Sequence, residues 1–287
     1  MTSVKQALNK FKDQLAALYD VREAESLGII TLTDVTGFSS AKLKAFPDGE
    51  LTKEQSGSIG KILTELKTGK PIQYILGRTE FYGLPFKVNS SVLIPRPETE
   101  ELVYWIISSV GGSKLAAGSI LDIGTGSGCI AVSLKKNLPD INVSAMDISI
   151  DALLTAKENA DLNQVDIHFI NQDILAPRHA PDAVRYNIIV SNPPYVTMED
   201  KTKMHRNVTD FEPHTALFVP ENDPLIFYKA IADFATENLE SGGLLFFEIN
   251  ESYGEQIVKL LETKKFNNIE LRKDMGGRDR MVTAIFK

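Results

Sequence analysis

The stretch Ser119-Ile120-Leu121-Asp122-Ile123-Gly124-Thr125-Gly126-Ser127-Gly128 decides the fold of this 287-residue chain. An apolar run predicts a strand over 119–123, a glycine-rich turn follows it, and a helical pattern opens at Cys129. In open α/β sheets, ligands bind beyond the carboxyl ends of the strands, where glycines allow tight turns and close approach of the backbone. Because a plain strand-to-helix connection can also be rich in glycine, the surrounding pattern matters.

Strands and helices alternate from residue 119 onward. Short apolar runs predict strands over 119–123, 143–146, 167–170, 188–190 and 244–249, and amphipathic segments predict helices over 129–138 and 152–163. Such alternation predicts a mainly parallel sheet with helices on both faces, which is a Rossmann-like α/β fold.

The sequence before this region predicts two further parts. Residues 1–75 predict a small all-α bundle, because apolar side chains recur at helical spacing, namely Val4, Leu8, Phe11, Leu15, Leu18, Ile59, Ile62, Leu63 and Leu66. Residues 76–93 predict a β-hairpin linker with Gly83-Leu84-Pro85 between its strands. Pro97 suits the first turn of the next helix, and residues 94–287 form the third part.

An acidic residue lies at the end of the second predicted strand. Asp147 follows Gly124 by 23 residues, and a carboxylate at this place can accept both hydroxyl hydrogens of a ribose. An adenosine-containing cofactor is therefore expected, and both a nicotinamide dinucleotide and S-adenosylmethionine fit Asp147. The G-x-G-x-G pattern of Gly124, Thr125, Gly126, Ser127 and Gly128 favours S-adenosylmethionine, because this cofactor has no pyrophosphate to bind.

Two residues after the third strand extend this prediction. Asp173 could meet the adenine amino group and Ile174 could lie against the ring, although Asp173 could equally be a loop acid or a helix N-cap.

The tetrapeptide Asn192-Pro193-Pro194-Tyr195 leaves the carboxyl end of the fourth predicted strand. Two prolines fix the backbone and remove two N–H donors, so their carbonyl groups remain as acceptors. The Asn192 side chain and the Pro193 carbonyl can take the two hydrogens of an amide or aromatic amine, and Tyr195 supplies a flat face. This set predicts methylation of a planar nitrogen by positioning and electrostatic stabilisation, with Asn192, Pro193, Pro194 and Tyr195 as catalytic residues.

These motifs together resemble the HemK-type protein-(glutamine-N5) methyltransferases that modify peptide chain release factors. The matching segments are Pro71 to Gly77, Glu80 to Gly83, Leu93 to Glu100, Asp122 to Gly128, Asn192 to Tyr195, Phe211-Glu212-Pro213, Ala216-Leu217, Gly276 and Asp279-Arg280, which cover nearly the whole chain. Arg96-Pro97-Glu98-Thr99-Glu100 is the most diagnostic run. Two positions depart from the family, namely Asn250, where a glycine is usual, and Ile174, where an aromatic residue is frequent.

The resemblance implies a class I S-adenosylmethionine-dependent methyltransferase with a seven-stranded sheet. It implies transfer of a methyl group to the glutamine of a release factor's Gly-Gly-Gln motif, with S-adenosylhomocysteine as the second product. It also implies that 94–287 is catalytic, that 1–75 docks the factor, that the glycine loop, Asp147 and Asn192 contact the cofactor, and that Arg96 to Thr99 support the site. Alternatives are a ribosomal-protein glutamine methyltransferase, a DNA adenine-N6 methyltransferase and a cofactor-binding sensor without turnover.

Composition limits the remaining classes. The net charge of −7 disfavours a DNA enzyme, because phosphate contacts require a basic face, and no direct nucleic-acid binding is expected. Cys129 is the single cysteine, no signal peptide or membrane-spanning run is evident, and we expect a cytoplasmic monomer. No metal is expected, because the histidines are not at ligand spacing; they are His168, His179, His205 and His214.

Overall fold

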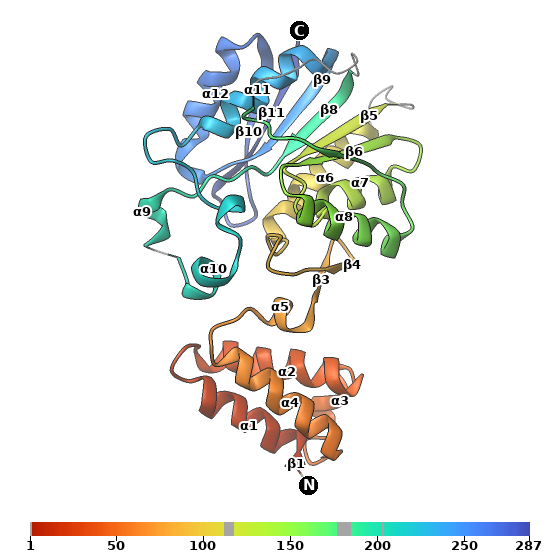
Figure 1. Cartoon of the computed structure of the whole chain (residues 1–287), viewed down its shortest axis with the longest axis vertical. Helices are drawn as coiled ribbons and strands as arrows, with labels where there is room; N and C mark the ends of the chain where they lie inside the picture. The colour runs from red at the N-terminus through yellow and green to blue at the C-terminus, as the bar shows by residue number, and fades with distance from the viewer. Residues whose placement is uncertain (1, 112–117, 177–184, 203) are drawn as a thin grey trace. The chain divides into compact units, whose positions relative to one another are not determined.

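The computed structural model describes residues 2–111, 118–176, 185–202 and 204–287 (Figure 1). The chain divides into two compact units. The first comprises Met1–Leu76 and Arg206–Phe211, and the second comprises Gly77–His205 and Glu212–Lys287. The domain boundaries at residues 75 and 93 stay predictions.

Helices make up most of the first unit. Its helices are α1 (Val4–Leu15), α2 (Val21–Thr36), α3 (Ser40–Ala45), α4 (Lys53–Leu66), α5 (Ile72–Leu76) and α10 (Arg206–Phe211). Ser3 and Thr52 begin α1 and α4 with capping boxes, in which a glutamine three residues later completes the second hydrogen bond. The apolar faces meet in a core that includes the fully buried Phe11, Leu32 and Leu66. The helical bundle predicted for this region is confirmed.

Two details of this unit differ from the sequence pattern. Leu18 is 40% exposed, because α1 ends at Leu15 and the chain turns there, so that Tyr19 is buried instead. In addition, β1 (Thr2–Ser3) pairs antiparallel with β2 (Glu50–Leu51). Strands of two residues are too short to produce an alternation that the sequence could reveal.

The predicted hairpin opens the second unit. Strands β3 (Arg78–Phe81) and β4 (Leu84–Lys87) pair antiparallel, with Phe81 opposite Leu84. The turn is therefore Tyr82-Gly83, shorter than the predicted Gly83-Leu84-Pro85. Both turn residues have positive φ, 51° and 70°, which matches the right-handed twist of two-residue hairpins.

A seven-stranded sheet forms the centre of the second unit. The strands in sheet order are β10 (Phe266–Lys273), β11 (Asp279–Phe286), β9 (Leu239–Glu248), β8 (Tyr186–Ser191), β5 (Ser119–Ile123), β6 (Asn142–Asp147) and β7 (His168–Asn171). The pairs from β9 through β7 are parallel, whereas β11 is antiparallel to β9 and to β10. The predicted mainly parallel sheet is confirmed. The strand order reverses between β5 and β8, and ligands bind at such a switch point.

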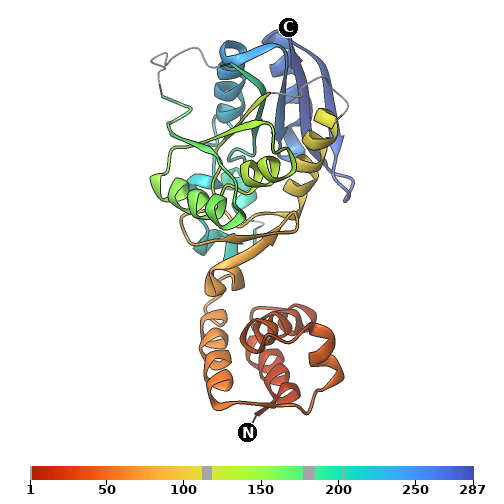
Figure 2. The same cartoon turned by 90° about the vertical axis from the view of Figure 1, so that its right-hand side faces the viewer.

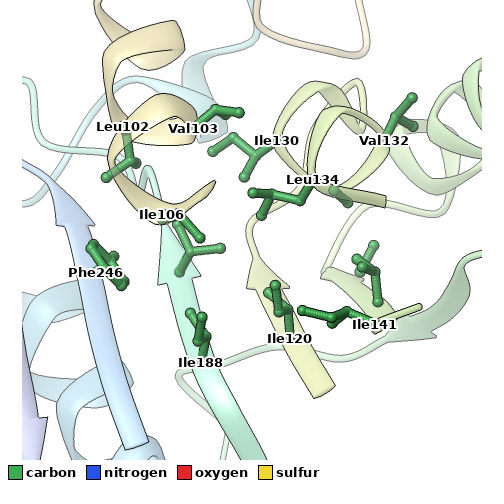
Figure 3. Close-up of a cluster of buried hydrophobic side chains, with 14 of the residues drawn as sticks. Leu102, Val103, Ile106, Ile120, Ile130, Val132, Leu134, Ile141, Ile188 and Phe246 are labelled. Atoms are coloured by element: carbon green, nitrogen blue, oxygen red, sulfur yellow. The ribbon is translucent and has the colours of Figure 1, made fainter. Parts of the chain in front are cut away.

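Helices cover both faces of this sheet (Figures 1 and 2). One face carries α6 (Pro97–Gly111), α7 (Cys129–Asn137) and α8 (Ile150–Asn163), and the other carries α11 (Ile226–Asn238) and α12 (Gly254–Thr263). Side chains alternate along a strand, so Ile120 of β5 packs under the first set and Leu121 under the second. Figure 3 shows the first core, where Ile106 and Ile130 point toward Ile120 and Ile188.

Short elements connect β8 to α11 and β9 to α12. They are α9 (Met198–Lys201), α10 and the 3₁₀ turns His214–Ala216 and Glu251–Tyr253. The long polar stretch 197–222 therefore contains helical turns among its described residues, which exclude residue 203.

Asn159 of α8 joins the hairpin to the glycine turn. It is fully buried, its Oδ1 accepts from the Lys87 backbone N–H at 2.6 Å, and its Nδ2 donates to the Lys87 carbonyl at 2.9 Å and the Ser127 carbonyl at 2.8 Å. A buried amide needs such partners, and here they fasten β4 and the turn after β5 to one helix.

Candidate active site

The glycine turn lies at the carboxyl end of β5 and folds back onto β6. The backbone N–H groups of Gly124 and Thr125 donate to the Met146 carbonyl at 2.8 and 3.0 Å. Gly124 and Gly126 have φ of 73° and 54°, a region that favours glycine, and a Cβ at either position would meet nothing within 4 Å. Both residues line a cavity, so the turn presents its bare backbone to that space.

This cavity has a volume of about 370 Å³. The structure brings the predicted cofactor residues together on its wall, and these are Gly124, Thr125, Gly126, Ser127, Asp147, Asp173, Ile174 and Asn192. Gly128 is the exception, because it is buried under α8, where a Cβ would come within 3.0 Å of the Ala156 Cβ.

Asp147 ends β6 beside the turn. Its Oδ2 accepts from the Gly126 N–H at 2.9 Å and its Oδ1 accepts from the Ser149 N–H at 2.9 Å. Burial raises the pKa of the carboxyl above its ordinary value, and these backbone hydrogen bonds oppose the rise. A carboxylate has about four acceptor positions, so each oxygen retains capacity for a hydroxyl group.

Asp173 and Ile174 follow β7 on the same wall. The Asp173 Oδ1 accepts from the Leu175 N–H at 2.8 Å, which is the local turn bond that a loop acid makes. Ile148, which the sequence did not single out, also lines the cavity beside Asp147. The cavity wall thus consists of a glycine turn without side chains, two carboxyl groups and aliphatic residues. This lining fits the amino-acid, ribose and adenine parts of S-adenosylmethionine.

The tetrapeptide leaves β8 between this cavity and a second one of about 380 Å³. Asn192 and Pro193 line both cavities, Pro194 lines the first and Tyr195 lines the second. The residue before the tetrapeptide is fixed to the end of β5, because the Ser191 hydroxyl donates to the Ile123 carbonyl at 2.7 Å. The two proline rings therefore project from a fixed strand end.

Two side chains that the sequence did not assign to the reaction hold the tetrapeptide. The Asn192 Nδ2 donates to the Thr99 Oγ1 at 3.2 Å, and the Thr99 hydroxyl donates to the Glu248 Oε2 at 2.6 Å. The Tyr195 hydroxyl donates to the Glu248 Oε1 at 3.2 Å. Thr99 falls within the run that the resemblance implies is supporting, whereas Glu248 lies inside the predicted strand 244–249 and had no role of its own. A charged residue at the end of the apolar run 244–247 was the available signal.

Arg96 and Glu212 fasten the segment before α6. The Arg96 Nη2 lies 2.6 Å from the Glu212 Oε1, and the Glu212 Oε2 accepts from the Ile94 N–H at 3.2 Å. The Glu212 side chain is buried, so the pair forms in a partly desolvated place. Arg96 lines both cavities, which places a fixed cation between them.

Asn250 replaces the glycine that is usual in the family. Its Oδ1 accepts from the Ser252 N–H at 2.9 Å, and its Nδ2 donates to the Tyr195 carbonyl and the Asp200 Oδ2, both at 3.3 Å. The Asn250 side chain therefore orders the turn at this departure from the family pattern and also contacts the tetrapeptide.

Nowhere in the described residues do three or more His, Cys, Asp or Glu side chains gather as a group that could hold a metal ion. His168 lies in β7, His205 in the loop before α10 and His214 in a 3₁₀ turn, and His179 lies outside the described residues. None of the helices in the described ranges is long and apolar enough to cross a membrane.

Comparisons with known proteins agree with this arrangement. A family model of the PrmC N-terminal domain matches residues 6–77, and one of the methyltransferase small domain matches residues 108–210. Among solved structures, a methyltransferase from Pyrococcus furiosus aligns with a TM-score of 0.51 at 15% identity, over 71% of this chain and 90% of that one. A 16S rRNA methyltransferase from T. thermophilus, in complex with AdoMet and guanosine, aligns with a TM-score of 0.53 at 18% identity, over 73% and 50%.

The fold is therefore that of the class I S-adenosylmethionine-dependent methyltransferases. Three curated relatives are each named release factor glutamine methyltransferase. The protein from Flavobacterium psychrophilum is 48% identical over 99% of both chains, that from Bacteroides thetaiotaomicron 41% over 95% of this chain and 96% of that one, and that from Streptococcus pneumoniae 38% over 97% of both. This chain belongs to the release factor glutamine methyltransferase family.

Proposed function

We propose that this enzyme transfers the methyl group of S-adenosylmethionine to the side-chain nitrogen N5 of a glutamine in a peptide chain release factor. Family membership supports the substrate, and the Gly-Gly-Gln motif follows from the resemblance described above. The observation that carries the proposal is that Asn192 and Pro193 line two cavities at once. A donor held in one cavity and an amide held in the other would meet at these two residues.

The first cavity would hold S-adenosylmethionine, which supplies an electrophilic methyl group on a sulfonium. The turn 124–128 would hold its amino-acid part by the backbone, Asp147 would accept from the ribose hydroxyls, and Asp173 with Ile174 would meet the adenine. Apart from Gly128, which supports the turn through α8, these residues line the cavity.

The second cavity would admit the glutamine. The Asn192 Oδ1 and the Pro193 carbonyl would accept the two N–H hydrogens of the amide, which orients the nitrogen and turns its lone pair toward the first cavity. Tyr195 lines the second cavity and would pack against the planar group. Fixed acceptors also stabilise the positive charge that develops on nitrogen, so positioning and electrostatics carry the catalysis.

Further parts of the proposal concern the whole chain. Residues 1–75 would dock the release factor, residues 76–93 would link this part to the catalytic part, and residues 94–287 would catalyse the methyl transfer. The single cysteine and the net charge of −7 support a cytoplasmic protein that works without binding nucleic acid, and we propose that it acts as a monomer.

The test is incubation of the full chain with labelled S-adenosylmethionine and a purified release factor, followed by peptide mapping. We expect one methyl group on the glutamine of the Gly-Gly-Gln peptide. A release factor with alanine in place of that glutamine is the matched control and should stay unlabelled. Labelling of a ribosomal protein or of DNA in parallel reactions, with an unlabelled release factor, would contradict the proposal.

A further inference from the structure

Glu248 is a carboxyl group buried at the end of β9, with 1% of its surface exposed. It receives hydrogen bonds from Thr99 on Oε2 and from Tyr195 on Oε1. Burying a carboxylate is unfavourable unless hydrogen bonds and charges compensate, so a group kept in this position needs a physical reason. Its two oxygens reach toward the two ends of the tetrapeptide, Asn192 through Thr99 and Tyr195 directly.

The number of hydrogens on each group fixes the direction of the hydrogen bonds that link Glu248, Thr99 and Asn192. A threonine hydroxyl has one hydrogen, and Thr99 gives it to the Glu248 carboxylate at 2.6 Å. Toward Asn192, the Thr99 oxygen can then only accept. The Asn192 amide must therefore turn its Nδ2 to Thr99, at 3.2 Å, and its Oδ1 the other way.

The negative charge of Glu248, which sets the direction of these hydrogen bonds, is compensated by Arg280. Arg280 acts on Glu248 electrostatically, donates to the Ile249 carbonyl at 3.5 Å and is itself fixed by Asp274 at 3.0 Å. The other titratable groups that influence Glu248 or are influenced by it are Tyr195, Glu98, Tyr228 and Cys129. Burial raises the pKa of Glu248, and the Thr99 hydrogen bond and Arg280 oppose that rise.

We propose that Glu248 is a positioning residue that sets the direction of the Asn192 amide through Thr99 and fixes the Tyr195 hydroxyl at the same time. With this order, Asn192 offers an acceptor, which an amide N–H can meet. With the reverse order, it would offer a donor, which would repel the N–H of glutamine. The inference rests on the proposed function, because it assigns a cause to the orientation that the reaction needs.

The substitution Glu248→Gln tests this proposal, because it keeps the size of the side chain but replaces one hydrogen-bond acceptor with a donor. We expect kcat for the release factor to fall about 10- to 100-fold, the effect of losing one or two hydrogen bonds to a charged group. The dissociation constant of S-adenosylmethionine should change less than about twofold, because Glu248 does not line the first cavity. Glu270→Gln is the control, an exposed carboxylate paired with Arg272 at 2.9 Å. Equal kcat for the two variants would overturn the inference.

Thr99 provides the second variant pair, which also serves if Glu248→Gln fails to fold. Thr99→Ser keeps the hydroxyl relay and should restore most of the activity that Thr99→Val loses. Adding Thr99→Val to Glu248→Gln should cost little beyond Glu248→Gln alone, because the hydrogen-bond path from Glu248 to Asn192 is already broken in that variant. Additive losses, or equal activity of the Ser and Val variants, would overturn it.

Methyl transfer by the unmodified enzyme is measured first. Its absence from the release factor glutamine would refute the proposed function and the inference together. Its presence, with full activity in Glu248→Gln, would refute the inference alone.

Discussion

The backbone N–H of Gly126 donates to the Asp147 carboxylate at 2.9 Å, so the turn after β5 and the end of β6 hold each other. The same carboxyl group is the proposed ribose acceptor. One residue therefore both shapes the cofactor turn and faces the cofactor cavity.

Replacing Asp147 should weaken cofactor binding. In Asp147→Asn, one oxygen becomes an amide donor and must face the Gly126 N–H, the Ser149 N–H or the ribose. We expect the affinity for S-adenosylmethionine to fall about 10- to 100-fold, the range for hydrogen bonds to a charged group. Isothermal titration calorimetry measures it, with the exposed Asp161→Asn as the matched control. An unchanged affinity would remove Asp147 from the cofactor site.

Replacing Asn192 should separate binding from transfer. Asn192→Ala removes an acceptor aimed at the reacting nitrogen, and we expect kcat to fall about 100- to 1,000-fold, as for loss of one fixed polar partner of a transition state. The release factor and cofactor should still bind. Single-turnover methylation with labelled cofactor gives the rate, and transfer at the rate of the unmodified enzyme would contradict the role of Asn192.

Substitution by alanine should change the stability of the chain in opposite directions at two glycines. Gly126 has a φ of 54°, so Gly126→Ala should cost about 1–2 kcal/mol of stability, and its methyl group should also hinder the cofactor. Gly57 lies exposed inside α4 with open space around it, so Gly57→Ala should stabilise the chain by about 0.5–1 kcal/mol. Urea unfolding of both variants and cofactor titration of the first check these values. Equal stability changes would show that the backbone conformation at Gly126 carries no strain.

Asp122 should make stability depend on pH. Burial raises the pKa of its carboxyl from 3.8 to about 7, although the Thr125 hydroxyl donates to its Oδ2 at 2.6 Å. In the unfolded chain this carboxyl ionises near 3.8, so unfolding between pH 4 and 7 releases a proton and stability falls as pH rises. A raised pKa of this size corresponds to about 4 kcal/mol between these limits.

Comparison with Asp122→Asn isolates this effect. The amide cannot ionise, so the difference in unfolding free energy between the two proteins should shift in favour of the variant from pH 4.5 to pH 8. Urea denaturation at a series of pH values provides the measurement. A difference that stays constant over this range would contradict the raised pKa of Asp122.

The sequence predicted those elements in which the apolar pattern and the residues at the boundaries indicate the same structure. The strand over 119–123 and the helix start at Pro97 match β5 and α6 at their first residues, because an apolar run and a proline each define a boundary. Strand β9 begins five residues earlier than predicted, because Leu239 pairs with Tyr186, whereas Glu240 to Gly243 lie at a register shift and lack apolar alternation. No run identified β10 and β11 individually, because exposed residues interrupt the apolar pattern of β10 and Thr283 divides the apolar residues of β11.

The candidate site was predictable where a motif carries it along the chain. Asp147, the glycine turn and Asn192 sit at strand ends, so topology alone brings them together. Glu248 and Thr99 are 149 residues apart, and the hydrogen bond that joins them depends on how α6 lies over the sheet. Sequence spacing contains no information about such a pair. The two cavities are likewise a property of packed side chains, which no single segment specifies.

Asn159 has a consequence for how the second unit opens. Its side chain bonds to both backbone groups of Lys87 and to the Ser127 carbonyl, and Asn163 adds a bond from its Nδ2 to the Pro85 carbonyl at 2.9 Å. The hairpin cannot detach from α8 without releasing the backbone next to the cofactor turn. Amide hydrogens of β4 and of the turn should therefore exchange with solvent as one cooperative group, and a ligand in the first cavity should slow the exchange of a hairpin that does not touch it.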